Sequence, residues 1–324
     1  MSIRKGRVNA LKRIVCGIIA LLLISSMFGV FAENTDEELA QRFASAVTME
    51  YNGKTYRLRN RLETILVLGT DRRNGESGGL IGTQADFLML IVLDDNHKTV
   101  TPIRINRDTM TQITATDLNG ENPRNAIGQI CLSYAYGDGE DGSCQLTAQT
   151  VSGLFFGVPI DHYYAVNMDG IATLNDAIGG VTVTLQDDFT MLDPSMAVGA
   201  TVHLQGKHAE YFVRSRMEVG DGSNENRMRR QKAYMDAAKP ILTGMLQNSP
   251  NSFGALYEKL EDYAVTDMAK GRIINTAVKI QRYDVLSSLA CDGENCEGLN
   301  GHVEFYPDEE SLRQIAVSVF FEED

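Results

Sequence analysis

Apolar positions along this 324-residue chain follow two local patterns that predict strands and helices. Short apolar runs rich in β-branched residues predict buried strands of a central sheet at 64–69, 86–93 and 99–105, and two further strands are predicted at 162–167 and 181–185. Helices are predicted at 144–156, 169–178, 206–214, 226–246, 257–262, 267–281 and 309–321, and apolar residues recur at near-helical spacing in the one at 226–246. Because strands alternate with helices, we expect an α/β fold with helices on both faces of the sheet.

The longest apolar run, Ile14–Ala32, is interrupted only by Ser25 and Ser26. Nineteen helical residues span roughly 28 Å, close to the hydrocarbon thickness of a bilayer. Five cations and no acid precede it, which predicts a cytoplasmic N-terminus and an extracytoplasmic remainder. A signal peptide cleaved after Ala32 is the alternative, and a buried soluble helix is a third. We favour the retained anchor because the run exceeds the usual signal core.

We therefore expect a single-pass protein of the cell membrane with four segments. Residues 1–13 form a cytoplasmic basic tail, 14–32 a transmembrane anchor, 33–60 an extracytoplasmic stalk, and 61–324 one folded domain. Within the stalk, Asn52-Gly53 predicts the turn of an edge hairpin.

The charge balance argues against a nucleic-acid partner. The chain has 30 Lys and Arg against 43 Asp and Glu, a formal charge of −13. Residues 33–324 contain 25 of those cations and all 43 acids, which gives −18. A general nucleic-acid binder would be basic over its binding domain.

The four cysteines after the apolar run permit three pairings. The pairing local in sequence joins Cys131 with Cys144 and Cys291 with Cys296. We expect two structural disulfides, consistent with an extracytoplasmic domain. The spacing does not suit a four-cysteine metal site.

Motifs of several enzyme classes are absent from the sequence. There is no Gly-x-Ser-x-Gly elbow, Walker loop, His-Glu-x-x-His or dinucleotide fingerprint. The five histidines form no spaced ligand set. Nothing therefore supports a serine hydrolase or a zinc enzyme.

Arginine is concentrated in one segment of this acidic chain. Six cations lie within nineteen residues: Arg214, Arg216, Arg227, Arg229, Arg230 and Lys232. Arg227 and Arg230 are three apart on a predicted helix, with Gln231 adjacent, so they can address one target. Because a guanidinium matches phosphate oxygens bidentately, the cluster suggests a diphosphate or polyanion site. The alternative is a solvated helix face paired with Glu218, Asp221 and Glu225.

Polar residues also follow or open the predicted strands. Asp71 follows the first strand, Asp86 opens the second, and Arg107-Asp108 follows the third. Two carboxylates at adjacent strand ends can share Mg²⁺, with phosphate oxygens and water completing its shell. Taken singly, each Asp suits a turn or a cap equally well. Together with the arginines, they predict metal-assisted phosphoryl chemistry.

These residues lie in motifs that resemble the LytR-CpsA-Psr (LCP) family of membrane-anchored cell-wall glycopolymer ligases. The resemblance is strongest over residues 64–238. The matching stretches are ILVLGTDRR at 65–73, ADFLMLIVL at 85–93, VTPIRINRDT at 100–109, SYAYGDG at 133–139, GVPIDHYYAVNMDG at 157–170, DAIGGVTV at 176–183, HLQGKHAEYFVRSR at 203–216 and NRMRRQ at 226–231.

The resemblance implies a single domain with a central mixed β-sheet, and a specific reaction. Family members transfer a phospho-glycan from a polyprenyl-pyrophosphate carrier to a peptidoglycan hydroxyl, with the prenyl tail in an apolar tunnel. The catalytic residues implied are Asp71, Arg107 and Asp108, and Asp71 with Asp86 would hold Mg²⁺ or Mn²⁺. The pyrophosphate-binding residues implied are Arg73, Arg107, Arg214, Arg216, Arg227, Arg230 and Gln231. We hypothesise that Asp108 orients or deprotonates the incoming hydroxyl.

Two positions depart from the family pattern. Gln84 stands where the family usually has Arg, and Gln129-Ile130-Cys131 stands where it has Lys-Ile-Asn. Each glutamine replaces a cation by an amide, which donates a weaker hydrogen bond. The alternatives to a ligase are therefore a catalytically weak lipid-pyrophosphate or wall-glycan binding protein, and a pyrophosphatase that uses water. We reject a DNA-binding attenuator because of the topology and the charge.

Overall fold

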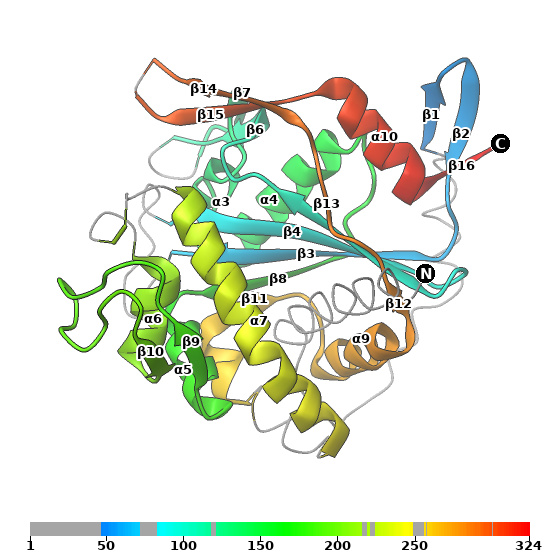
Figure 1. The fold of residues 1–324 in the computed structure, drawn as a ribbon. Coiled ribbons are helices and arrows are strands. Elements are labelled where there is room, and N and C mark those ends of the chain that lie inside the picture. The colour runs from blue at the N-terminus through cyan, green and yellow to red at the C-terminus, as the bar shows by residue number, and fades with distance from the viewer. Residues whose placement is uncertain are drawn as a thin grey trace, which may run out of the picture.

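A mixed β-sheet of seven strands runs through the middle of the computed structural model (Figure 1). The structure describes residues 47–71, 83–117, 121–215, 219–220, 224–248, 256, 258–299 and 301–324. The strand order is β11 (Ala264–Thr266), β8 (His162–Asn167), β3 (Leu62–Thr70), β4 (Ala85–Asp94), β5 (Thr99–Ile105) and β12 (Asp284–Val285), with β13 (Leu289–Ala290) also paired to β5.

The strand directions bring several chain segments to one edge of this sheet. Strand β3 is parallel to β8 and antiparallel to β4, which is in turn antiparallel to β5. The carboxyl ends of β3, β5 and β8 therefore share an edge with the beginning of β4. The predicted strands at 64–69, 86–93, 99–105 and 162–167 are confirmed, and the sheet is mixed as expected.

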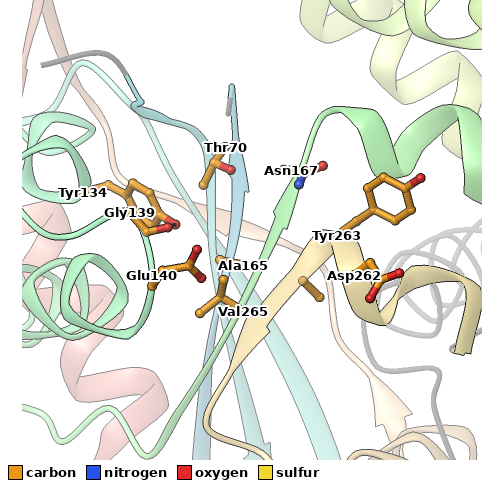
Figure 2. Close-up of a pocket in the computed structure, with 10 residues that line it drawn as sticks. Thr70, Tyr134, Gly139, Glu140, Ala165, Asn167, Asp262, Tyr263 and Val265 are labelled. Carbon is orange, nitrogen blue, oxygen red and sulfur yellow. Dashed lines mark hydrogen bonds between the residues drawn. The ribbon is translucent and has the colours of Figure 1, made fainter. Parts of the chain in front are cut away.

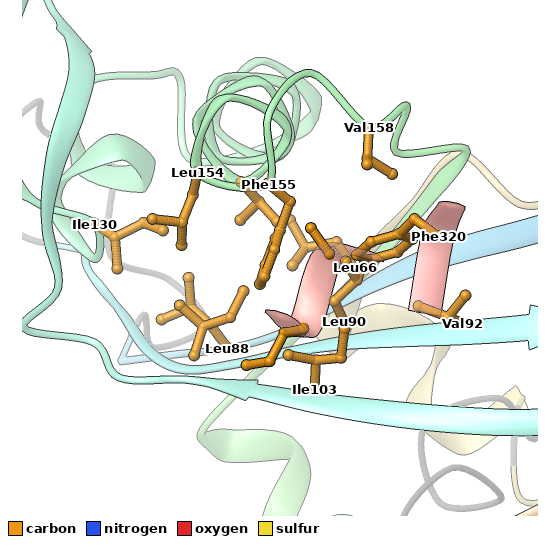
Figure 3. Close-up of a cluster of buried hydrophobic side chains, with 14 of the residues drawn as sticks. Leu66, Leu88, Leu90, Val92, Ile103, Ile130, Leu154, Phe155, Val158 and Phe320 are labelled. Atoms are coloured by element: carbon orange, nitrogen blue, oxygen red, sulfur yellow. The ribbon is translucent and has the colours of Figure 1, made fainter. Parts of the chain in front are cut away.

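Helices cover both faces of the sheet, as the alternation of elements predicts. On one face, α4 (Asp141–Leu154) and α10 (Glu309–Phe320) pack on alternate residues of β3 and β4. Figure 3 shows Phe155 and Phe320 beside Leu66 and Leu90, which are fully buried. On the other face, α9 (Lys270–Arg282) covers the intervening residues, and Ile273 contributes to a core with Ile65 and Ile91.

A third hydrophobic cluster lies beside the sheet and contains the arginine-rich helix. It is built by α5 (Asp169–Ala177), α6 (Lys207–Arg214), α7 (Asn224–Asn248) and the hairpin of β9 (Val181–Thr184) with β10 (Thr201–Leu204). Helix α7 packs through Tyr234, Ala238 and Leu242, which are buried at near-helical spacing.

The predicted hairpin at the N-terminal side is present and belongs to the folded domain. Strands β1 (Thr48–Tyr51) and β2 (Lys54–Leu58) are joined by Asn52 and Gly53, both at positive φ, as a tight hairpin turn requires. The C-terminal strand β16 (Phe321–Glu323) pairs antiparallel with β2. The end of the predicted stalk is thus joined to the end of the chain (Figure 1).

Several short elements have no counterpart in the strands and helices predicted from sequence. Two are hairpins: β6 (Met110–Ala115) with β7 (Arg124–Gln129), and β14 (Gly293–Glu297) with β15 (Val303–Pro307). A further short helix without a predicted counterpart is α3 (Leu132–Ala135), whereas the 3₁₀ turn η1 (Glu261–Tyr263) overlaps the end of the helix predicted at 257–262. The two hairpins lie side by side at one end of the sheet (Figure 1).

No helix within the described ranges is long and apolar enough to cross a membrane. The predicted anchor at 14–32 and the basic tail at 1–13 lie outside those ranges. Both stay predictions.

The predicted disulfides are wrong for this structure, in which all four described cysteines are free. Cys144 lies on the buried face of α4, in the core, and the Cys131 thiol contacts an arginine. Cys291 lies two residues before β14 and Cys296 lies within it, so the extended backbone from Gly293 to Cys296 alone spans roughly 10 Å. Disulfide-bonded cysteines need Cα atoms within about 7 Å, so the extended backbone prevents this pairing.

Candidate functional site

Asp71 is fixed where β3 passes to β4. Its backbone N–H donates to the Gln84 carbonyl at 3.2 Å, and the Gln84 N–H donates to Asp71 Oδ1 at 2.7 Å. The first bond extends the backbone contact of β3 with β4 by one residue beyond Thr70, and in the second the Asp71 side chain accepts instead of its carbonyl. They place the Asp71 carboxylate at the edge where β3, β5 and β8 end.

Asp86 lies in an irregularity of the same pairing. The register passes from Gly69–Phe87 to Thr70–Ala85, so it skips Asp86. An extra residue of this kind is a β-bulge, which bends the strand and re-aims its side chain. The bulge turns the Asp86 carboxylate toward cations from two other segments.

Two guanidiniums converge on the Asp86 carboxylate, one on each oxygen. Arg107 Nη1 contacts Oδ1, and Arg227 Nη1 donates to Oδ2 at 3.1 Å. Arg107 follows β5, whereas Arg227 comes from the first turns of α7, 141 residues beyond Asp86. The three side chains are 12%, 19% and 9% exposed for Asp86, Arg107 and Arg227. Their burial makes these charge-assisted contacts stronger than equivalent surface pairs.

The neutral residues that depart from the family pattern surround Arg107. Its Nη2 donates to Gln84 Oε1 at 2.6 Å and lies 3.4 Å from Cys131 Sγ. Burial raises the pKa of the Cys131 thiol, although the adjacent guanidinium opposes that effect, so the sulfur stays protonated. Arg107 Nε is buried without a hydrogen-bond partner among the described residues, with Asp108 Oδ1 at 3.4 Å.

The second departure contacts Asp108. Gln129 Nε2 donates to Asp108 Oδ1 at 3.1 Å, from the end of β7. Gln84 and Gln129 therefore each hold one of the two residues of the Arg107-Asp108 pair. Sequence reasoning singled out these glutamines as lost cations but did not predict that they orient the pair.

Arg230 and Gln231 make a different set of contacts, at the carboxyl end of α6. Arg230 donates through Nε to the Phe212 carbonyl at 3.0 Å, and its Nη2 contacts the Ser215 carbonyl. Gln231 Nε2 donates to the Val213 carbonyl at 3.3 Å. The last carbonyls of a helix have no hydrogen-bond partner within the helix. A cation placed there is attracted to the partial negative charge of the helix dipole. In this structure both side chains cap α6.

The remaining guanidinium nitrogen of Arg230 completes an ion pair. Arg230 Nη1 donates to Asp187 Oδ2 at 3.0 Å, and Arg229 Nη2 donates to Asp187 Oδ1 at 2.7 Å. Arg230 is 3% exposed, which excludes the solvated-face alternative for this residue. No local pattern distinguished Asp187 in the sequence.

The structure thus separates the predicted site residues into two groups. Asp71, Asp86, Arg107, Asp108 and Arg227 lie together at the edge of the sheet. Arg214, by contrast, pairs with Glu210 on its own helix at 2.9 Å, and Arg230 and Gln231 bind α6, so these three do not join the group. Arg73 and Arg216 lie outside the described residues.

Metal ligation at this edge would depend on two carboxylates. The described residues contain no group of three or more His, Cys, Asp or Glu that could hold a metal ion. Asp71 and Asp86 offer oxygen donors in the number that Mg²⁺ usually takes from a protein. Asp86 already accepts from two arginines, but carboxylate oxygens have further lone pairs.

A cavity of about 110 Å³, lined by Thr70 and Asn167 among others, lies at the carboxyl ends of β3 and β8. Figure 2 shows Thr70 and Asn167 at the strand ends, Glu140 before α4, and Asp262 with Tyr263 opposite. Polar groups line much of this cavity, so it does not correspond to the apolar prenyl tunnel that the resemblance implies. That tunnel stays a prediction.

Fold and site together define an α/β protein with a buried arginine–carboxylate cluster at the strand ends of its central sheet. The sequence model of the LytR_cpsA_psr family matches residues 26–319. The chain belongs to this family, as the sequence motifs predict.

Two curated relatives share a name, polyisoprenyl-teichoic acid–peptidoglycan teichoic acid transferase TagU. The protein from Bacillus licheniformis is 28% identical over 259 residues, which covers 79% of this chain and 76% of the relative. The protein from Bacillus mycoides is 30% identical over 212 residues, covering 65% of this chain and 62% of the relative. The match thus spans about three fifths of the second relative's length.

The fold occurs in solved structures as well. Protein gbs0355 from Streptococcus agalactiae superposes with a TM-score of 0.63 at 19% identity, over 80% of this chain and 86% of that one. At this identity the likeness establishes the fold alone.

Proposed function

We propose that this chain transfers a phospho-glycopolymer from a polyprenyl-pyrophosphate carrier to a hydroxyl of peptidoglycan. The observation that carries the proposal is the convergence of Arg107 and Arg227 on Asp86, beside Asp71, at one sheet edge. Family membership and the names of the TagU relatives support it.

The arginines suit a diphosphate donor. The buried Nε of Arg107 makes no hydrogen bond among the described residues, with Asp108 Oδ1 3.4 Å away, so a phosphate oxygen could accept from it. In the transfer, the acceptor oxygen bonds to the phosphorus next to the glycan, and the bond from that phosphorus to the bridging oxygen breaks. Polyprenyl phosphate leaves with the electron pair. Guanidiniums held at the bridging oxygen would stabilise the charge that develops there.

The charges of the cluster fit a divalent cation. Among the described residues, Asp71, Asp86 and Asp108 outnumber Arg107 and Arg227, which leaves one excess negative charge that would repel a diphosphate. Asp71 and Asp86 would hold Mg²⁺, which supplies positive charge to the phosphate oxygens when it is bound.

Asp108 would accept the proton of the incoming hydroxyl. Its Oδ1 is fixed by Gln129 and lies beside Arg107, so the carboxylate is held next to the proposed phosphate position. A positioned base of this kind contributes typically 100- to 10,000-fold to a rate.

We also propose that the domain lies outside the cytoplasm, tethered by the apolar run at 14–32. An anchor would keep the site beside a lipid-linked donor. Protease added to protoplasts, whose membrane is intact, should degrade the domain and spare the N-terminal tail. Protection of the domain would refute this topology.

The test of the function is a transfer assay with the purified full-length chain. Labelled polyprenyl-pyrophosphate glycan is mixed with peptidoglycan oligomers, with Mg²⁺ or EDTA. We expect label on peptidoglycan with Mg²⁺ only, and a loss of about 100- to 1000-fold in Asp71→Asn and Arg227→Ala. Arg229→Ala is the matched control, because this neighbour on α7 is 46% exposed and contacts Asp187 instead of Asp86.

Other outcomes would favour the alternatives. Tight donor binding without turnover would indicate a binding protein, which the two glutamines in place of family cations favour. Release of phospho-glycan without peptidoglycan would indicate a pyrophosphatase. The absence of both donor binding and turnover would refute the proposed site itself.

A further inference from the structure

The C-terminal hairpin β14–β15 contacts the Asp108 segment directly. The Phe305 N–H donates to the Asp108 carbonyl at 2.9 Å, and Thr109 and Phe305 form an isolated parallel bridge. Chain segments almost 200 residues apart thus share backbone hydrogen bonds next to the arginine–carboxylate cluster. Figure 1 shows β15 alongside β6, which begins just after Asp108.

Gln129 adds a side-chain connection between the same two segments. Its Nε2 donates to Asp108 Oδ1 at 3.1 Å and to the Val303 carbonyl at 2.7 Å. A side-chain amide has two N–H donors, and here one serves the carboxylate while the other serves the hairpin. The Asp108 side chain is 17% exposed, so this bond is partly shielded from water.

These contacts restrict Asp108 from two sides. Its backbone carbonyl is held by β15, and its carboxylate is held by an amide that β15 also binds. A carboxylate with one oxygen fixed by a donor keeps its other oxygen in a defined direction. A catalytic side chain that is already fixed in this way loses less entropy when it reaches the reactive geometry.

We propose that Gln129 is a positioning residue that couples the C-terminal hairpin to Asp108, so that the hairpin is part of the active site. The kinetic part of this inference rests on the proposed function. The coupling itself does not.

The variant that tests the coupling is Gln129→Glu, which keeps the side-chain shape but replaces both donors by acceptors. The new carboxylate would face Asp108 and the Val303 carbonyl, and repel both. Gln129→Lys restores a donor and serves as the rescue. Gln314→Glu is the matched control, since Gln314 also donates to a carboxylate, Glu310 Oε1 at 3.0 Å, but on the exposed face of α10.

The first readout is hydrogen exchange of the Phe305 amide in the full-length chain. We expect exchange at least about tenfold faster in Gln129→Glu, with recovery in Gln129→Lys and no change in Gln314→Glu. Amides of β3 serve as the internal check that the domain stays folded. Unchanged Phe305 exchange in a folded Gln129→Glu variant would overturn the proposal, whether or not the protein is a transferase.

The second readout is steady-state transfer to peptidoglycan. We expect kcat to fall roughly 10- to 100-fold in Gln129→Glu at a nearly unchanged KM for the lipid donor, because Asp108 loses its orientation while the arginines keep theirs. Partial recovery in Gln129→Lys would distinguish positioning from general damage. Faster Phe305 exchange with an unchanged kcat would overturn the catalytic role. If the wild type has no activity, the proposed function fails and the exchange result alone decides the coupling.

Discussion

Replacing Arg230 by alanine should destabilise the domain far more than replacing its neighbour Arg229. Both guanidiniums bind the same carboxylate, Asp187, but their side chains are 3% and 46% exposed. Arg230 also binds the Phe212 and Ser215 carbonyls and stacks over the Phe189 ring at 5.6 Å. The two variants therefore compare a buried and an exposed ion pair on one helix.

The expected magnitudes follow from burial. Removing one partner of a buried pair costs about 3–5 kcal/mol, whereas an exposed pair contributes about 0–1 kcal/mol. For a domain of this size a urea m-value of roughly 3 kcal/mol/M converts these costs into midpoint shifts. We expect a downward shift of about 1–1.7 M for Arg230→Ala and less than about 0.3 M for Arg229→Ala.

The assay is urea unfolding followed by circular dichroism, with Asp187→Ala and both double mutants to complete the cycles. The Arg230–Asp187 cycle should show a coupling energy well above that of Arg229–Asp187. Equal midpoint shifts for the two arginine variants would refute the anchoring role. If Arg230→Ala has normal stability but transfers no glycan, Arg230 binds the phosphate, as the sequence motif predicts.

Three further predictions concern the cluster, a helix cap and the thiols. Asp86→Asn should lower transfer at least about 100-fold in initial-rate assays, because it removes the charge that both Arg107 and Arg227 bind; an unchanged rate would contradict the site. Burial opposes ionisation of Asp138, but the N–H groups at the start of α4 outweigh it and lower the pKa. The stabilisation by this cap is therefore complete above about pH 4 and is lost as the pH falls through the folded-state pKa. Asp138→Ala should lower the free energy of unfolding by about 1 kcal/mol at pH 7 and leave it unchanged in strong acid. Urea midpoints measured at both pH values test this. Iodoacetamide should label exposed Cys296 in the native protein and buried Cys131 only after unfolding, as measured by mass spectrometry. If Cys296 reacts only after a reductant is added, it forms a disulfide and the prediction is wrong.

Much of the sheet could be predicted because its strands are buried on both faces. Strand β5 matches the predicted 99–105 at both ends, and the β3 and β4 predictions are short by three residues and two. By contrast, β14 is exposed along its whole length and carries no apolar run that would reveal it. Hydrophobic periodicity detects elements through burial, so an exposed hairpin has no such signal.

The site was predictable in composition but not in assignment. Strand ends mark Asp71, Asp86 and Arg107, since polar residues that follow buried runs must lie at the sheet edge. Arg227 and Arg230 could not be distinguished by sequence, because residues three apart share a helix face. Their destinations differ because Arg230 reaches the carboxyl end of α6 and Asp187, whereas Arg227 reaches Asp86 at the sheet edge.

The sequence by itself determined the local structure of this protein and the kinds of side chain at its sheet edge. Burial, helix spacing and strand ends follow from residues that are close together in the sequence, and the family motifs lie in the same segments. The tertiary structure alone decided that Asp86 occupies a bulge, that Arg227 reaches it from 141 residues away, and that the C-terminal hairpin holds Asp108 through Gln129. Such contacts depend on how distant elements dock, and local propensity does not encode the register of that docking.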